Sequence, residues 1–353
     1  MFDRLAGNQR VKELLKRTLE SRRVPGALLF SGEEGVGKKL FALEIAKALN
    51  CRSPNGVEAC DQCSACVRIS KFNYPQSRDP DDLVEMIRSD HADVGMMVAP
   101  KRVLLVNQMR QIEREANYRP FEGKARVFLI DDADKLNEPS ANALLKVLEE
   151  PPPTSYLILI TSRPAMLLPT IRSRCQMIRF SPLTADEIEQ HLLQTKAASG
   201  MEARLRARFA HGSIGRALAS DIESFKLQRA AMLKVIEALV SDDRALLLLS
   251  SEELNSASQK ETFESSLDIL ETLIRDALMM SLSIQSDGIV NDDLRPQLAK
   301  VAEHISSSQA AGWIAKIEEL REQLVVNINR KVATDALFLS MTPDKGASAF
   351  SPD

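Results

Sequence analysis

The sequence contains no apolar run of about 18 residues, the length that a membrane-spanning helix requires. Residues 1–20 alternate charged residues with leucine and lack the apolar core of a secretory signal, so the expected location is the cytoplasm. Hydrophobic residues are not scarce either, because they make up 44% of the chain, beside 27% charged residues. This balance excludes a disordered chain and indicates a globular protein, and 353 residues are enough for two or three domains.

Histidine is scarce and scattered. The four histidines, His91, His191, His211 and His304, lack the mutual spacing of a metal or catalytic site. We therefore interpret all four as structural or surface residues.

Neither sign of charge dominates, since the net charge is −3. The two halves nevertheless differ: residues 1–180 carry 28 Lys and Arg against 23 Asp and Glu, and residues 181–353 carry 18 against 26. The basic excess of the first half is compatible with contact to a polyanion. An ordinary solvated surface is the simpler interpretation.

Short apolar runs alternate with helical patterns in the first half of the chain. Residues 38–49 and 140–150 have helical patterns, and strands alternating with helices predict an α/β fold, with a parallel sheet covered by helices on both faces. From Thr184 onward only helical patterns follow, so we expect boundaries near 181–184 and near 219–224. The predicted strands are residues 27–30, 102–106, 126–130, 156–160 and 177–180.

The segment GEEGVGKKLF, residues 32–41, nearly matches a phosphate-binding loop. That pattern is G-x-x-x-x-G-K followed by Ser or Thr: backbone N–H groups face the phosphates, the lysine neutralises their oxygens and the hydroxyl binds Mg²⁺. Gly32, Gly37 and Lys38 match, but Lys39 stands where the hydroxyl belongs. The segment predicts a nucleotide loop that has lost a metal ligand and gained a cation.

An acidic partner for this loop follows a later apolar run. In VFLIDDAD, residues 127–134, Asp131 comes directly after the run, and in P-loop ATPases such an aspartate holds Mg²⁺. The next acidic residue polarises the attacking water, and here it is Asp132, one methylene shorter than the glutamate of active motors. The pattern alone is weak evidence, but together with the upstream loop it indicates a nucleotide site.

Four of the five cysteines lie in one short stretch, residues 51–66, with the spacing C-x8-C-x2-C-x2-C. Thiolates bind Zn²⁺ tetrahedrally, and C-x2-C spacing places two sulfurs on one ion. A disulfide pair or unpaired thiols are the alternatives, although a reducing cytosol disfavours disulfides. Four sulfur ligands leave no open position, so we expect structural rather than catalytic zinc. The expected ligands are Cys51, Cys60, Cys63 and Cys66.

Longer strings resemble the clamp-loader subunits of bacterial DNA polymerase III, which are AAA+ proteins, over nearly the whole length. NALLKVLEEPP and SRC are highly specific to this group, whereas a stretch near residues 70–90 departs from it and looks inserted. The strings are GEEGVGKK, the four-cysteine insert, LIDDADKLNEPSANALLKVLEEPP (129–152), LILITSRPAMLLPTIRSRCQMIRFSPL (157–183), GSIGRALA (212–219) and NINRKVATDALFLSM (327–341).

The resemblance implies four regions along the chain. They are an AAA+ nucleotide-binding-fold domain (1–180) that carries the zinc module (51–66), a helical lid domain (181–220), a helical collar domain for oligomerisation (221–342) and a flexible tail (343–353).

The resemblance also implies roles for single residues. Arg174, in SRC, corresponds to an arginine finger, which stabilises charge at the γ-phosphate bound by a neighbouring subunit. Without the resemblance, a structural arginine is the simpler interpretation. Thr161 corresponds to the first sensor, although a strand-end cap would look the same, and Arg216 corresponds to the second sensor or only holds the lid. The residues expected in the degenerate nucleotide site are Gly32, Gly35, Gly37, Lys38, Asp131, Asp132, Thr161 and Arg216.

Lys39 and Asp132 depart from the pattern at the two metal-handling positions, so we expect this chain to hydrolyse ATP weakly or not at all. The resemblance then implies a stator of the polymerase holoenzyme. It would join gamma/tau and delta subunits in a hetero-pentameric ring that loads the sliding clamp on primer–template DNA. An active gamma/tau-type motor is the alternative, supported by Lys38 and Asp131, and an AAA+ module outside replication is a third. Binding of ATP with Mg²⁺ stays open.

Overall fold

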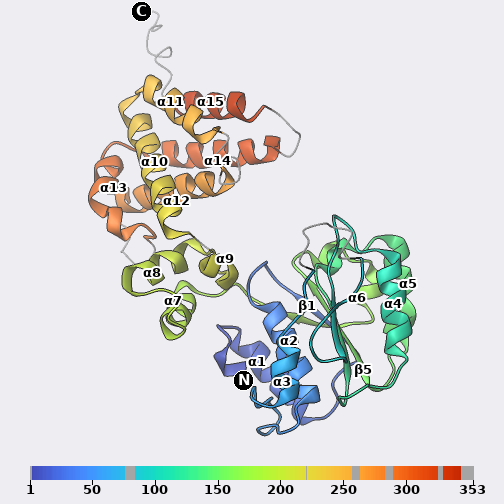
Figure 1. The fold of residues 1–353 in the computed structure, drawn as a ribbon. Coiled ribbons are helices and arrows are strands. Elements are labelled where there is room, and N and C mark those ends of the chain that lie inside the picture. Colours follow the sequence, from blue (N-terminus) through green and yellow to red (C-terminus); the bar gives the residue numbers. More distant parts are fainter. Residues whose placement is uncertain are drawn as a thin grey trace, which may run out of the picture. The chain divides into compact units, whose positions relative to one another are not determined.

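The computed structural model describes residues 2–75, 84–219, 221–256, 263–282, 289–324 and 329–342. The chain divides into two compact units, Met1–Ala219 and Ser220–Asp353 (Figure 1). No helix of the described residues is both long enough and apolar enough to cross a membrane. The expected flexible tail lies outside the described residues, as do residues 76–83 of the stretch that looks inserted.

The first unit is built on a six-stranded sheet with the order β2-β3-β4-β5-β1-β6. Neighbouring strands are parallel, except that β2 pairs antiparallel with β3 at one edge. This confirms the predicted α/β fold. The strands are β1 (Ala27–Ser31), β2 (Ile87–Arg88), β3 (Val94–Met97), β4 (Arg126–Ile130), β5 (Ser155–Thr161) and β6 (Gln176–Arg179).

Helices cover both faces of this sheet (Figure 1). The helices of the first unit are α1 (Gln9–Glu20), α2 (Lys38–Asn50), α3 (Ser64–Ile69), α4 (Val106–Ala116), α5 (Glu138–Glu149), α6 (Pro169–Arg172), α7 (Ala185–Gln194), α8 (Gly200–Phe209) and α9 (Ile214–Ala219), with short 3₁₀ turns η1 (Phe2–Arg4), η3 (Ala133–Lys135) and η4 (Pro164–Met166).

Alternate residues of each strand serve opposite faces, because successive side chains of a strand point to opposite sides. In β4, Val127 and Leu129 pack into the core that contains α1 and α2, whereas Phe128 and Ile130 pack into the core that contains α4 and α5. The helices α7 to α9 join the first of these cores through residues such as Ile188. Burial on both faces explains why the strands are continuous apolar runs.

The predicted strand at residues 102–106 is wrong. Leu104 forms only an isolated bridge to Leu136, and Val106 already begins α4. The side chain of Gln108 accepts a hydrogen bond from the backbone N–H of Leu105, which closes the first turn of a helix rather than extending a strand. The strand beside β4 is instead β3, whose four residues are all buried.

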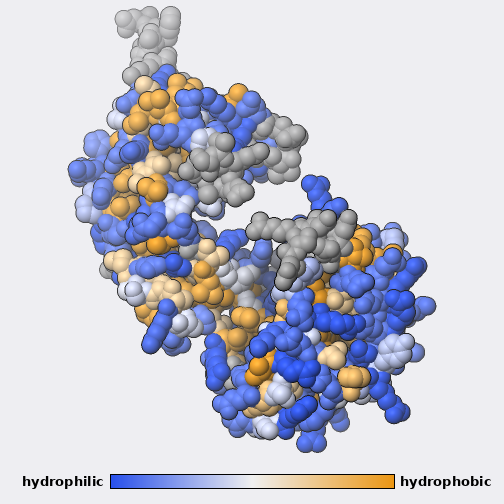
Figure 2. Space-filling view, in the orientation of Figure 1, coloured by the Kyte–Doolittle hydropathy of each residue, from blue (hydrophilic) through white to orange (hydrophobic). Residues whose placement is uncertain are grey.

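The second unit consists of helices, with no strand among its described residues. Its elements are α10 (Ile222–Ser241), α11 (Arg244–Leu254), α12 (Phe263–Ser281), η7 (Asp292–Leu294), α13 (Arg295–Ala302), α14 (Ser307–Leu324) and α15 (Arg330–Met341). The indole N–H of Trp313 donates to the carbonyl of Met341 at 2.7 Å and ties α14 to α15. The surface seen in Figure 2 is largely hydrophilic, with apolar residues exposed in separate patches.

Candidate functional site

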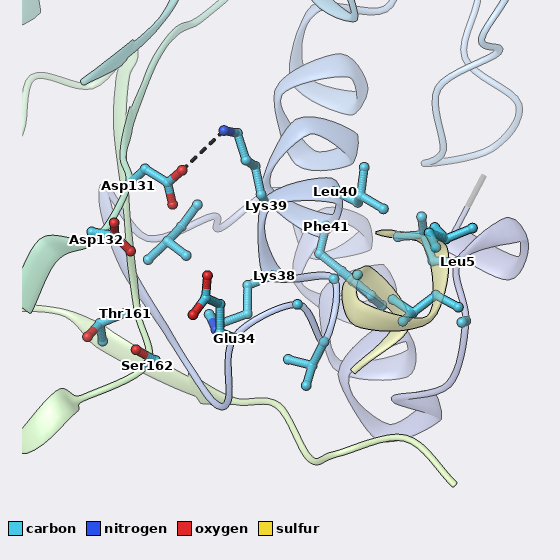
Figure 3. A pocket seen from close by; sticks show the side chains of 18 of the residues that line it. Leu5, Glu34, Lys38, Lys39, Leu40, Phe41, Asp131, Asp132, Thr161 and Ser162 are labelled. Carbon is cyan, nitrogen blue, oxygen red and sulfur yellow. Dashed lines mark hydrogen bonds and ion pairs between the residues drawn. The ribbon is translucent and has the colours of Figure 1, made fainter. Parts of the chain in front are cut away.

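The glycine-rich loop joins β1 to α2 and borders a cavity of about 380 Å³ (Figure 3). Gly37 has φ +97°, a left-handed conformation that favours glycine, and it lies directly before α2. The free N–H groups at a helix N-terminus attract anions, so this turn can bind a phosphate group. The other wall is apolar and includes Leu5, Phe41 and Leu218. His191 also lines the cavity, a position that its isolated place in the sequence did not predict.

Lys38 is buried in the wall of this cavity, with 7% of its surface exposed. Its ammonium donates hydrogen bonds to the carbonyls of Gly32 at 2.6 Å and Glu33 at 2.5 Å. Burial lowers the pKa of Lys38, and nearby carboxylates, first Asp131, oppose that shift. The loop's own carbonyls therefore hold the ammonium where a bound phosphate would meet it.

Lys39 points to Asp131, and its Nζ lies 3.1 Å from Oδ2 of that carboxylate (Figure 3). The ring centroid of Tyr74 lies 5.9 Å from the same Nζ. Burial acts to lower the pKa of Lys39, but Asp131 and Tyr74 outweigh it and raise the pKa above its ordinary value. Lys39 therefore stays charged and neutralises the carboxylate that sequence reasoning assigned to a metal.

The residues of this site do not fit Mg²⁺. Mg²⁺ demands octahedral coordination by oxygen atoms, yet position 39 offers an ammonium in place of a hydroxyl. Asp131 is already paired with that ammonium, and the carboxylate of Asp132 lies 2.8 Å from Nζ of Lys135. Both carboxylates expected to handle the metal thus have cationic partners from this chain.

Thr161 lines the cavity at the end of β5, but its hydroxyl is hydrogen-bonded to Asp134, which does not line the cavity. Its hydroxyl donates to Oδ1 of Asp134 at 2.6 Å, and Nε and Nη2 of Arg163 donate to Oδ2 at 3.0 and 2.6 Å. Burial opposes ionisation of Asp134, but these hydrogen bonds outweigh it and lower the pKa. Sequence reasoning missed this network, although the third acid of the DDAD string was a visible signal.

Helix α9 contacts the glycine-rich loop directly. The N–H of Gly215, in α9, donates to the carbonyl of Gly35 at 3.0 Å. A Cβ at Gly35 would lie 2.1 Å from the hydroxyl oxygen of Ser213, so only glycine fits this approach. Two predicted site residues are not among those that line the cavity: Arg216 is exposed on α9, and Gly32 packs against Phe180.

Arg174 lies just after α6 and does not line the cavity. Its Nη2 lies 2.7 Å from Oε1 of Glu149, and its Nη1 donates to the carbonyl of Thr170 at 3.1 Å. The side chain keeps 34% of its surface exposed and that of Glu149 keeps 49%. An exposed pair of this kind contributes little to stability, so the guanidinium can exchange partners at small cost.

The four clustered cysteines come together in the first unit, with sulfur atoms all within 4.8 Å of one another. The Sγ atom of Cys51 lies 3.6 Å from that of Cys60 and 3.9 Å from that of Cys63, and the Cys63 and Cys66 sulfurs are 3.5 Å apart. These separations exclude a disulfide, whose sulfurs are about 2.05 Å apart. The cluster is a candidate metal centre.

Backbone N–H groups point at the sulfurs of this cluster. The N–H of Cys60 donates to Sγ of Cys51 at 3.3 Å, and that of Cys63 donates to Sγ of Cys60 at 3.2 Å. Burial acts to raise the pKa of the Cys63 thiol, but hydrogen bonds from backbone N–H groups outweigh burial and lower that pKa to about 6. Burial raises the pKa of Cys66 and of Cys51. Such donors stabilise the thiolates that a metal requires.

Two family models match the chain. A model described as DNA polymerase III, delta subunit, matches residues 7–184, and one described as its C-terminal part matches residues 222–341. The chain belongs to the DNA polymerase III delta-subunit family. The two matches include the glycine-rich loop, the cysteine cluster, Arg174 and nearly all of the second unit.

Curated relatives refine this family membership. The chain is 28% identical to the DNA polymerase III subunit delta′ of Bacillus subtilis, over 94% of this chain and 95% of the relative. It is also 28% identical to subunit delta′ of Escherichia coli, over 93% and 92%. Identity to the gamma/tau subunit of Mycoplasma pneumoniae is 29%, but covers 67% of this chain and only 33% of the relative. Full-length similarity is therefore to delta′ (delta-prime) subunits.

Proposed function

We propose that this chain is a delta′-type subunit of the bacterial DNA polymerase III clamp loader, acting as a largely non-hydrolysing stator. The observation that carries the proposal is the ion pair between Lys39, which replaces the expected hydroxyl ligand, and Asp131, the carboxylate expected to hold the metal. Similarity to delta′ subunits over nearly the full length of both chains supports it.

The absence of hydrolysis follows from the electrostatics of the site. Hydrolysis in P-loop ATPases needs a metal that bridges the β- and γ-phosphates and a residue that orients the attacking water. Lys39 repels a divalent ion, and Asp132 is one methylene shorter than the glutamate that orients water in active motors. The pocket is suited to binding a phosphate, not to transferring one.

The stator contributes to catalysis through Arg174, which acts on the nucleotide of a neighbouring motor subunit. Arg174 lies outside its own chain's cavity and is partly exposed, as a finger that acts across an interface must be. In the free chain, Glu149 holds the guanidinium, and the γ-phosphate of the neighbour replaces that carboxylate on assembly. A phosphate carries more charge than this carboxylate and can accept two hydrogen bonds from a guanidinium.

The cysteine cluster binds structural zinc. Four Zn–S bonds of about 2.3 Å in a tetrahedron place the sulfurs about 3.8 Å apart, and the three distances given above run from 3.5 to 3.9 Å. When bound, zinc supplies a cross-link between Cys51, at the end of α2, and Cys66 within α3. The four thiolates complete its coordination, so it takes no part in phosphate chemistry.

The proposed partners are the gamma/tau and delta subunits in a hetero-pentameric ring, the sliding clamp and, through the complex, primer–template DNA in the cytoplasm. The helical second unit, which matches the C-terminal family model, is the proposed collar by which the ring assembles.

Reconstitution tests the proposal. Motor, delta and clamp subunits are assayed for clamp loading on primed DNA with and without this chain, and loading should require it. ATP turnover of the isolated chain tests the gamma/tau alternative. Robust turnover would favour a motor, whereas turnover at background with restored loading would support the stator.

A further inference from the structure

The cavity beside the glycine-rich loop keeps groups that bind phosphate although it has lost its metal ligands. Lys38, Lys39 and the N-terminus of α2 border it, and a helix N-terminus favours anions. Its volume of about 380 Å³ lies within the range of small-ligand pockets, and Leu5 and Leu218 give it an apolar wall for a base. The cavity thus retains the glycine-rich loop, two lysines and an apolar wall, although the carboxylates of Glu34, Asp131 and Asp132 also line it.

Lys39 lines this cavity at the sequence position of the expected metal-binding hydroxyl, and its ammonium pairs with Asp131. Its ammonium has three N–H donors, and Asp131 accepts from one of them at 3.1 Å. A phosphate oxygen can accept from another without breaking the ion pair. The ammonium can therefore link the carboxylate to a phosphate, which is the electrostatic task of the missing ion.

The stretch that looks inserted supports the same lysine. Tyr74, at the start of that stretch, lies with its ring centroid 5.9 Å from Nζ of Lys39. Phe72 packs beside Tyr74, with ring centroids 6.4 Å apart. An aromatic ring attracts a cation at this distance, so the ammonium is held between a carboxylate and a ring. A divalent ion at Asp131 would have to compete with this ammonium.

We propose that this cavity binds the diphosphate group of a nucleotide without Mg²⁺, with the Lys39 ammonium in place of the metal ion. The inference rests on the proposed function, because a stator can hold nucleotide as a fixed ligand and need not turn it over. The favoured ligand is a metal-free nucleoside diphosphate.

The test is the binding of fluorescent ADP to the whole purified chain at constant ionic strength, with EDTA or with excess Mg²⁺. Saturable binding in EDTA, equal to or tighter than in Mg²⁺, is expected, since Mg²⁺ also sequesters free ADP in solution. Tighter binding in Mg²⁺ would overturn the proposal, and so would no saturable binding in either buffer.

Two variants sharpen this test. Lys39→Thr restores the loop pattern and removes the ammonium, so binding in EDTA should weaken by about tenfold or more, as for loss of a charged hydrogen bond. Its remaining binding should now require Mg²⁺. Lys146→Thr removes the same charge from an exposed lysine on α5 and should change nothing. If both variants weaken ADP binding equally, the loss comes from the lower overall charge of the protein, and this result would contradict the assigned role of Lys39.

Clamp loading by the reconstituted complex is measured separately on the same preparations. A chain that supports loading but binds no ADP would overturn only the metal-free site. A chain that binds ADP in EDTA but does not support loading would overturn the stator function and leave the site standing.

Discussion

The nucleotide cavity and the cysteine cluster are both candidate ligand sites in the first unit, but only the cavity contains its own counter-ions. Lys39 in the cavity and Lys135 beside it already pair with the carboxylates expected to handle the metal. In the cluster, four sulfur atoms lie within 4.8 Å of one another, and two of them accept hydrogen bonds from backbone N–H groups. Ionised thiols at that distance would repel one another, so an external cation would stabilise the ionised cluster, whereas Asp131 in the cavity already has a cation from this chain.

This contrast predicts the largest effect at the cluster. Cys63→Ser should release the metal and lower the free energy of unfolding by about 5 kcal/mol or more, because binding energy at a structural zinc site is folding energy. Metal content by mass spectrometry and thermal unfolding check this. Cys175→Ser is the matched control, since Cys175 is buried outside the cluster and its loss should leave the metal in place. Native protein that carries no metal would refute the comparison.

The second prediction concerns ATP hydrolysis, which the cavity of this chain is not expected to carry out but which Arg174 is proposed to promote in a neighbouring subunit. In the assembled loader, Arg174→Ala should slow hydrolysis at the neighbouring motor site by about 10³, the order of an arginine finger's contribution, while the other sites keep part of the total rate. Arg174→Lys should restore little, since an ammonium lacks the planar two-pronged contact. Clamp-stimulated ATPase of the reconstituted complex is the measurement.

Glu149→Ala provides the control for that variant. It removes the partner of Arg174 in the free chain but leaves the guanidinium. If Arg174 acts across an interface, this variant should load clamps normally. If Arg174 acts only through its ion pair with Glu149, the two alanine variants should show the same defect, and this result would refute the proposed arginine finger.

The smallest expected effect is at the ion pair that joins α3, the helix that contains Cys66, to the loop before β4. Arg68 in α3 lies 2.6 and 2.7 Å from the two carboxylate oxygens of Glu122. These hydrogen bonds lower the pKa of Glu122 to about 2. Because the folded pKa lies below the unfolded value of about 4.3, this stability is fully present above about pH 4.3. It is lost as pH falls toward 2.

Glu122→Gln should therefore cost about 1–2 kcal/mol at neutral pH and nothing at pH values below both pKa values. Denaturant unfolding of the two proteins across this pH range gives the difference. A cost that stays constant with pH would show that packing, not the charge of Glu122, holds the module.

Much of the fold could be predicted from local patterns. The run RVFLI coincides with β4, and the phosphate-loop helix begins at Lys38 as expected, because apolar runs and glycine turns act over short distances. The strand β3 was missed, since VGMM is short and contains a glycine, whereas RVLLV looks more strand-like. Residues 94–97 form a strand because they are hydrogen-bonded to β4, and no local sequence pattern shows that pairing.

The sequence by itself determined which chemical groups are available: a glycine loop with two lysines, an acidic strand end and four spaced cysteines. Only the tertiary structure decided how these groups pair. Lys39 and Asp131 are 92 positions apart, and they meet because β1 and β4 both flank β5 in a parallel sheet, whose carboxyl ends lie at one edge. The hydrogen bonds of Asp134 to Thr161 and Arg163 arise at the same edge. Charge neutralisation depends on distance in space, which spacing along the chain does not contain.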